Sequence, residues 1–333
     1  MEAQAVTASY LPWQSDLLER AMSLKLQQRL PHAILIESSS TRDVSEFIYH
    51  LSMLLLCDHA QENQFCGECE SCSLMLNSTY ADFNSVGLEY DSKTKKLNKN
   101  IKIEQIRDII HELHLTPRFE RLKIATIYPA EKMSHAAANS LLKTLEEPAD
   151  RVLLLLVTHN QGRIPVTLRS RCQIWTMKPA KKSEAMDWLE QKSVEADEVS
   201  RYLEFAGGDP LLALHLKDQD YAGLVADFKP RFVRYIRGDL PVSSLVQNLK
   251  AFELPSIRRL LDMIFAAYCY QFSGIDSAGN AAGSENRAAV QALTSLKTKA
   301  QRQLMIEENN LDLQLQLEDV LISCKQIITR RSS

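Results

Sequence analysis

From Lys123 to Cys172 the sequence reads KIATIYPAEKMSHAAANSLLKTLEEPADRVLLLLVTHNQGRIPVTLRSRC. Two apolar runs in this stretch, Lys123 to Tyr128 and Val152 to Val157, have the length and composition of buried strands. The segment between them, Ala136 to Pro148, is rich in alanine and leucine and predicts a helix. A strand, a helix and a second strand in this order predict an α/β fold.

A further strand and helix are predicted upstream, at Ala33 to Ile36 and Val44 to Leu56. The connection at residues 37–43 lies where a nucleotide-binding α/β protein has its phosphate loop. Such a loop needs glycines, a lysine and a Ser or Thr in a fixed pattern. The pattern is missing, the first glycine of the chain is Gly67, and Glu37 and Asp43 add negative charge. We therefore interpret residues 37–43 as a degenerate phosphate loop and expect no bound ATP.

Four of the seven cysteines form a cluster with the spacing C-x8-C-x2-C-x2-C, namely Cys57, Cys66, Cys69 and Cys72. Four thiolates favour tetrahedral Zn²⁺, and because all four positions are filled by protein such a zinc is structural. An iron–sulfur cluster and uncommitted thiols are the alternatives. The bacterial ferredoxin run needs a fourth cysteine after three intervening residues, followed by proline, and here Ser73-Leu74-Met75 follows Cys72 without either. The isolated Cys172, Cys269 and Cys324 are expected to be small buried apolar residues.

Length and composition limit the class of protein. A chain of 333 residues is long enough for two or three domains, and 45% hydrophobic with 24% charged residues is typical of globular proteins. Its longest aliphatic run, Val152 to Val157, is far shorter than the roughly 20 residues of a membrane span. We expect a cytoplasmic protein. The net charge of −3 argues against a surface built wholly to coat nucleic acid.

A basic run follows the cysteines and includes Lys93, Lys95, Lys96, Lys99 and Lys102. A solvated loop and a contact with a DNA backbone are both compatible with it. Next, a helix is predicted with one apolar face, formed by Ile103, Ile106, Ile110 and Leu113.

Two motifs make the sequence similar to a known family. Asn139 to Pro148 reads NSLLKTLEEP and Ser170 to Cys172 reads SRC, and both resemble motifs of the bacterial clamp-loader subunits in the AAA+ family. The resemblance implies a RecA-like AAA+ domain. It also implies that Arg171 reaches out of its own subunit toward the γ-phosphate held by a neighbour. A guanidinium is planar and permanently charged, which suits it to stabilising a transferred phosphoryl group.

The chain departs from the active members of that family at several positions. Tyr128 and Pro129 stand where ATPases of this layout have the Asp and Glu that serve magnesium and water. Leu211, in the motif Gly207 to Leu214, stands where active members have a sensor arginine. Members of the family share the four-cysteine module. The resemblance therefore implies a non-hydrolysing subunit that retains its arginine finger.

The implied function is that of a rigid stator in the clamp loader of the DNA polymerase III holoenzyme, which supplies Arg171 in trans. The implied partners in this hetero-oligomer are the ATPase (tau/gamma) subunits and the delta subunit. Sliding clamp and primer-template DNA would be reached through the assembled complex. Two alternatives stay open at this point, a zinc-containing DNA-binding protein and a divergent but active AAA+ ATPase.

Three domains are predicted. Residues 1–178 form the AAA+ domain with its zinc module at 57–72, residues 179–219 a helical lid, and residues 220–333 a helical collar. Helical periodicity supports the collar, with apolar positions at Ile257, Leu260, Leu261, Ile264, Phe265 and Tyr268 and again at Leu317, Val320, Leu321, Cys324 and Ile328. An ordinary helical bundle would have the same pattern. Ser273 to Asn286 lacks periodicity and predicts a loop.

Overall fold

The computed structural model describes residues 10–38, 43–91, 97–117, 121–192, 194–249, 251–273, 284–304 and 313–329. The chain divides into two compact units, Met1–Glu184 and Ala185–Ser333. Most of the degenerate phosphate loop and three lysines of the basic run, Lys93, Lys95 and Lys96, lie outside the described residues. The division into three domains stays a prediction.

A five-stranded sheet forms the centre of the first unit, and every pairing in it is parallel. Its order is β2-β3-β4-β1-β5. The strands are β1 (Ala33–Ser38), β2 (Phe83–Val86), β3 (Lys123–Ile127), β4 (Val152–Thr158) and β5 (Gln173–Met177). All residues of β3 and β4 are buried, as the two apolar runs predicted. The predicted α/β fold with a parallel sheet is confirmed.

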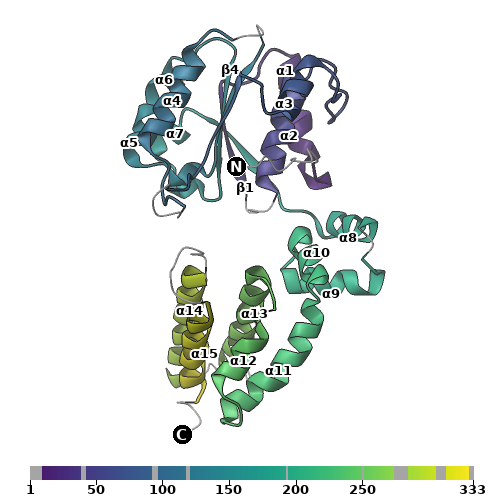
Figure 1. The fold of residues 1–333 in the computed structure, drawn as a ribbon, viewed down its shortest axis with the longest axis vertical. Helices are drawn as coiled ribbons and strands as arrows, with labels where there is room; N and C mark the ends of the chain where they lie inside the picture. Colours follow the sequence, from purple (N-terminus) through teal and green to yellow (C-terminus); the bar gives the residue numbers. More distant parts are fainter. Residues whose placement is uncertain are drawn as a thin grey trace. The chain divides into compact units, whose positions relative to one another are not determined.

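Helices cover both faces of this sheet (Figure 1). One face carries α1 (Ser15–Leu26), α2 (Val44–Leu56) and α3 (Glu70–Leu76). The other carries α4 (Ile103–His114), α5 (His135–Ser140), α6 (Leu142–Glu146) and α7 (Val166–Arg169). Short 3-10 turns are η1 (Pro12–Gln14), η2 (Ala130–Lys132) and η3 (Gln161–Arg163). Successive side chains of β1 belong to opposite layers: Ile34 and Ile36 pack under α2, and Leu35 packs with Ile106 of α4.

The segment predicted as one helix from Ala136 onward is interrupted. It forms α5 and α6, with Leu141 between them. The hydroxyl of Ser140 donates to the carbonyl of Ala137 at 2.7 Å, and the amide of Leu141 donates to the carbonyl of Ala138. Serine competes in this way with the regular hydrogen bonds of a helix and tightens the turn. Sequence periodicity alone gave no sign of the break.

The second unit is helical throughout its described part. Its elements are α8 (Lys182–Gln191), which begins in the first unit, α9 (Ala196–Ala206), α10 (Pro210–Asp218), α11 (Tyr221–Arg237), α12 (Val242–Leu249), α13 (Leu254–Ser273), α14 (Ser284–Leu304) and α15 (Leu313–Thr329). Gly207 ends α9 with a φ of 67°, in the left-handed region that glycine adopts without strain. The predicted loop was partly wrong, because Ser284 to Asn286 begin α14.

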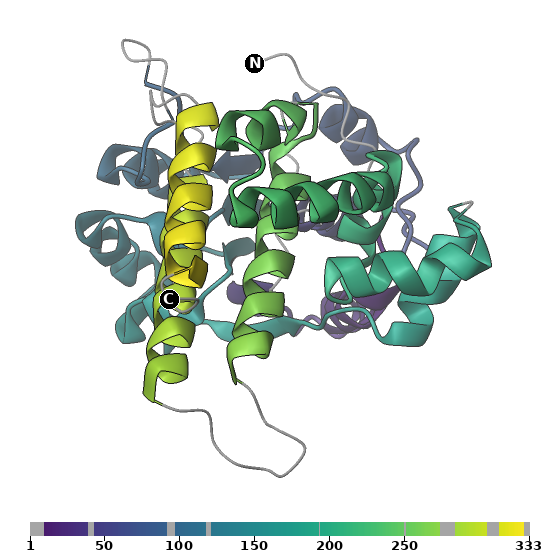
Figure 2. The same cartoon turned by 90° about the horizontal axis from the view of Figure 1, so that it is seen from below.

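The apolar faces predicted for the C-terminal region are confirmed except at Tyr268, which is half-buried. Ile257, Leu260, Leu261, Ile264 and Phe265 of α13 are buried, as are Leu317, Val320, Leu321, Cys324 and Ile328 of α15. Figure 2 shows α14 and α15 side by side, and α14 also packs against α13. No helix in the described ranges has both the length and the hydrophobicity that crossing a membrane requires.

Candidate functional site

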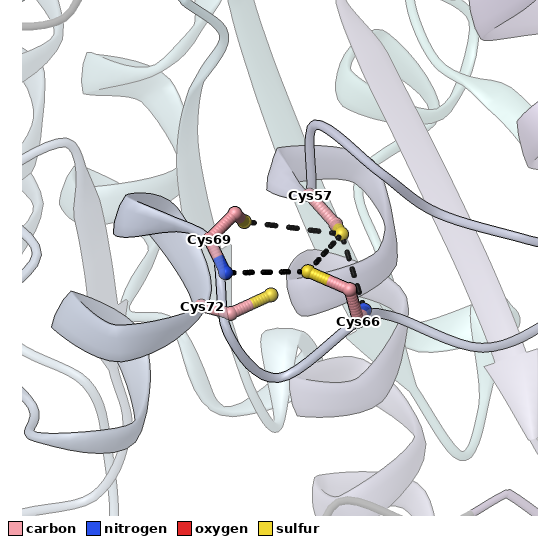
Figure 3. A group of neighbouring side chains, drawn as sticks. All are labelled: Cys57, Cys66, Cys69 and Cys72. Carbon is pink, nitrogen blue, oxygen red and sulfur yellow. Dashed lines mark hydrogen bonds between the residues drawn. The ribbon is translucent and has the colours of Figure 1, made fainter.

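The four clustered cysteines converge at one place on the first unit (Figure 3). Cys57 follows α2, Cys66 and Cys69 lie in the next loop, and Cys72 lies in α3. Their Sγ atoms all lie within 4.8 Å of one another, with Cys57 3.5 Å from Cys66 and 4.0 Å from Cys69. A disulfide needs about 2.05 Å between sulfurs, so these are free thiols. Gly67, between two of the cysteines, has a φ of 76° and lets the loop reverse.

This donor set fits a tetrahedral zinc ion. Zn–S bonds of about 2.3 Å place the sulfurs of a tetrahedron about 3.8 Å apart, close to the spacings here. The amides of Cys66 and Cys69 donate to the Sγ atoms of Cys57 and Cys66, both at 3.3 Å. Amide donors favour a thiolate. Burial raises the pKa of Cys57 and Cys72, whereas amide hydrogen bonds lower the pKa of Cys66 to about 7.

Two cationic side chains lie beside the cysteines. Lys25, in the last turn of α1, donates from Nζ to the carbonyl oxygen of Cys57 at 3.2 Å. Arg121, shortly before β3, forms an ion pair with Asp58 at 2.9 Å and donates to the Ser71 hydroxyl at 2.7 Å. These contacts tie the cysteine loop to α1 and to the sheet.

A chain of hydrogen bonds joins the carboxyl ends of three strands. The Tyr128 hydroxyl, just after β3, lies 2.8 Å from Nε2 of His159, which follows β4. Nδ1 of the same His159 lies 3.1 Å from the carbonyl oxygen of Ser38, the last residue of β1. The carboxyl edge of a parallel sheet is where α/β proteins bind ligands. At this edge the hydroxyl of Tyr128 is hydrogen-bonded to His159.

Carboxylates at the same edge are also held by neighbours. Glu131 accepts from the Thr158 hydroxyl at 2.8 Å, and Glu37 accepts from Nε2 of Gln161 at 2.6 Å. Asp43 accepts from the buried Gln14 at 2.6 Å. Burial, followed by the charges of Glu131 and Asp43, raises the pKa of Tyr128 to about 12. The phenol is therefore neutral near pH 7 and acts as a hydrogen-bonding group.

Arg171 lies just beyond α7, a short helix that begins after Pro165. Its Nη1 donates to the carbonyl of Thr167 at 2.8 Å, and its Nη2 forms an ion pair with Glu146 of α6. The side chain keeps 35% of its surface exposed. Arg169 instead donates to the carbonyl of Gln161. Val166, at the start of α7, is exposed and lies on the same helix as Arg169.

The remaining predicted positions lie apart from these groups along the chain. Leu211 is half-buried near the start of α10, in the second unit. Lys99 and Lys102, the described lysines of the basic run, are exposed just before α4. No basic patch is built from them in the described residues.

A parallel sheet with helices on both faces and polar groups at its carboxyl edge defines an open α/β domain of the doubly wound class. The family model described as "DNA polymerase III, delta subunit" matches residues 13–181. DNA polymerase III subunit delta' of Haemophilus influenzae is 30% identical over 242 residues, which cover 72% of this chain and 71% of that protein. This chain therefore belongs to the delta-prime family of DNA polymerase III subunits.

Two further similarities were found. The delta' subunit of Escherichia coli K12 is 30% identical over 212 residues, 63% of this chain and 62% of that protein. The crystal structure of a DNA polymerase III gamma subunit-related protein from Thermotoga maritima aligns with 92% of this chain and 99% of its own, at 17% identity and a TM-score of 0.48.

Sequence reasoning missed several residues of these sites. Glu146 belongs to the quoted LEEP motif, yet nothing in its spacing indicates a pairing with Arg171. Arg121 and Lys25 lie far from the cysteines in sequence, so only the fold brings them close. Gln161, the partner of Glu37, has no local signal.

Proposed function

We propose that this chain is a non-hydrolysing subunit of the DNA polymerase III clamp loader, acting in the cytoplasm as a rigid stator. Family membership supports the clamp-loader role. The tau/gamma ATPase subunits and the delta subunit are its proposed partners, and it meets sliding clamp and primer-template DNA through the assembled complex. The single observation that carries the proposal is a contrast. The SRC arginine is retained and partly exposed, whereas the carboxyl edge has Tyr128 in place of a catalytic acid.

Arg171 is the proposed arginine finger for the ATP site of a neighbouring ATPase subunit. Its ion pair with Glu146 is half-exposed, with 50% of the Glu146 side chain accessible. Exposed ion pairs contribute only about 0–1 kcal/mol. A phosphoryl group held by the neighbour therefore competes readily for the guanidinium, because both ligands are planar or trigonal arrays of oxygens.

The absence of nucleotide binding by this chain is the second part of the proposal. Phosphates would approach the carboxyl edge of the sheet, where Glu37, Asp43 and Glu131 place three carboxylates. Like charges repel, and neither Tyr128 nor Pro129 offers a carboxylate in the position that serves magnesium. The geometry thus favours a scaffold over an active ATPase.

The cysteine cluster is the proposed structural zinc site of this subunit. Cys57, Cys66, Cys69 and Cys72 would hold the ion, and four protein ligands leave no position for a reactive water. Metal analysis of protein purified without chelator is expected to give about one zinc per chain. Iron in place of zinc, or no metal, would contradict the assignment.

The test of the finger is Arg171→Ala in a reconstituted clamp loader with wild-type partners. Hydrolysis at the adjacent ATP site is expected to fall by about 10³-fold or more, since a finger in trans contributes about 10³–10⁵. Assembly, followed by size-exclusion chromatography, is expected to be unchanged. Arg163→Ala, at an exposed position in η3, is the matched control.

Three outcomes would count against the proposed function. Unchanged single-turnover hydrolysis with Arg171→Ala would remove the finger. Magnesium-dependent ATP binding by the isolated chain would show that the carboxyl edge is still a working nucleotide site. Steep salt-dependent DNA binding by the lone chain would instead favour a DNA-binding protein.

A further inference from the structure

The proposed zinc centre has an electrostatic requirement that its four ligands do not meet. Each cysteine binds as a thiolate, so Zn²⁺ with four of them has a net charge of −2. Cys57 and Cys72 are buried, and an uncompensated charge is unfavourable away from water. Asp58, Glu68 and Glu70, next to the cysteines in sequence, add three more negative charges. Cations near the cluster are therefore needed.

Arg121 contacts both halves of the cysteine module. Its guanidinium lies 2.9 Å from Asp58, which follows Cys57, and 3.7 Å from Glu70, between Cys69 and Cys72. It also donates to the hydroxyl of Ser71, a residue with no exposed surface, at 2.7 Å. Arginine presents several N–H groups in a rigid plane, so one side chain fixes the spacing of two segments. Arg121 itself lies shortly before β3, at the amino end of that strand.

Lys25 approaches the cluster from a different element. It lies in the last turn of α1 and is half-buried, and its Nζ is 3.2 Å from the carbonyl oxygen of Cys57. That carbonyl is the backbone of a ligand, so the ammonium lies within a few bonds of the metal position. An ammonium here acts as a compact point charge, unlike the planar fork of Arg121.

We propose that Lys25 and Arg121 are the outer-shell cations of the zinc centre. They offset its net negative charge and hold the two cysteine-bearing segments against α1 and the start of β3. The inference rests on the proposed zinc assignment. It deepens that assignment, because it names residues outside the cysteine motif that set how tightly the metal is held.

The experiment measures zinc affinity in the full-length protein by competition with a colorimetric chelator. Arg121→Gln and Lys25→Gln are each expected to lower zinc affinity about 10-fold, within the 10- to 100-fold range that removal of outer-shell partners costs. The double variant is expected to lose more. Arg107→Gln and Arg29→Gln, which replace exposed arginines, are the matched controls and are expected to bind zinc as wild type does.

Conservative variants separate charge from geometry. Arg121→Lys keeps the positive charge but lacks the planar guanidinium. Its zinc affinity is expected to lie between those of wild type and Arg121→Gln. Cobalt absorption spectra of all variants are expected to keep the tetrahedral thiolate signature, because the four ligands are unchanged. Should Arg121→Gln fail to fold, Arg121→Lys and Lys25→Gln still decide the matter.

The failures of the two proposals are distinguishable. Wild-type protein that takes up no zinc would remove the metal centre and this inference with it. Wild-type protein that holds zinc, with Lys25 and Arg121 variants of equal affinity, would overturn this inference alone.

Discussion

The cysteine cluster and the carboxyl edge of the sheet both gather polar side chains from separate segments, but they pair them differently. At the cluster, four like groups point at one centre, and their thiolate forms would repel one another without a cation. At the edge, donors meet acceptors: Tyr128 contacts His159, and Gln161 donates to Glu37. The thiolate form of the cluster therefore requires a cation, whereas these donors and acceptors at the edge pair with one another.

The largest expected effect tests whether the cysteine cluster requires a cation. Cys72→Ser is expected to abolish stoichiometric zinc binding and to lower the free energy of unfolding by about 4 kcal/mol, the linkage for a ligand at about 1,000 times its Kd. Denaturant unfolding with and without chelator measures it. Cys269→Ser, outside the cluster, is the control, and equal unfolding curves for the two variants would contradict a metal-dependent module.

A buried ion pair at the amino ends of β2 and β3 gives the next largest effect. Lys123 Nζ lies 3.4 Å from Asp82, with both side chains 3% exposed, and donates to the carbonyls of Glu112 and Leu115. Lys123→Met is expected to cost about 3 kcal/mol, the lower end of the range for breaking a buried ion pair, because the buried Asp82 loses its ammonium partner. Zinc content is expected to stay at the wild-type level.

Denaturant titration, with Lys99→Met as an exposed control, measures this effect. A loss below about 1 kcal/mol would mean that Asp82 is better solvated than its burial indicates.

The pairing of donors and acceptors at the carboxyl edge predicts a smaller effect at Tyr128. Tyr128→Phe removes the hydrogen bond to His159 and is expected to cost about 1 kcal/mol of stability. It is not expected to create ATP affinity, since the carboxylates nearby remain. Thermal unfolding and nucleotide titration measure the two quantities, with the exposed Tyr90→Phe as control. Gain of ATP binding would show that the tyrosine, and not the missing phosphate loop, blocks the site.

The last expected effect is absent near neutral pH and concerns Cys172, a thiol outside the cysteine cluster. Burial raises the pKa of Cys172 to about 11, from an ordinary value of 9.0. The neutral thiol is favoured in the folded protein, so its stabilising contribution is complete below pH 9.0 and is lost as pH rises through 11. The free energy of unfolding is therefore expected to fall more steeply over this pH window for wild type than for Cys172→Ala. Parallel pH profiles for the two would contradict the effect.

The elements of the sheet were largely predictable because their signals are local. Apolar runs of the right length gave β1, β3 and β4, and helical spacing gave α2 to the residue. The short β2, Phe83–Val86, and β5, Gln173–Met177, carry mixed burial and no clear apolar run. Edge strands face solvent on one side, so their sequences resemble those of loops.

The sites were predictable only where chemistry is concentrated in a motif. The cysteine spacing identified all four converging thiols, because cysteine is rare and its spacing specific. The partners were not predictable: Arg121 reaches Ser71 across 50 residues, and Tyr128 reaches His159 across 31. Such pairs depend on strand order, which periodicity does not specify. Arg171 was found through a family motif, and its role as a finger stays a prediction.

The strand order also determines when β1 can pair with its neighbouring strands during synthesis of the chain. Ile34 of β1 pairs with Leu155 of β4 and Gln173 of β5, so its neighbours are made about 120 residues later. A ribosome needs on the order of 10 s to supply them. The four clustered cysteines lie between Cys57 and Cys72, so they are all synthesised within a short interval. Until β5 has emerged, β1 lacks its neighbouring strands, and such unpaired strands expose an unfinished chain to aggregation.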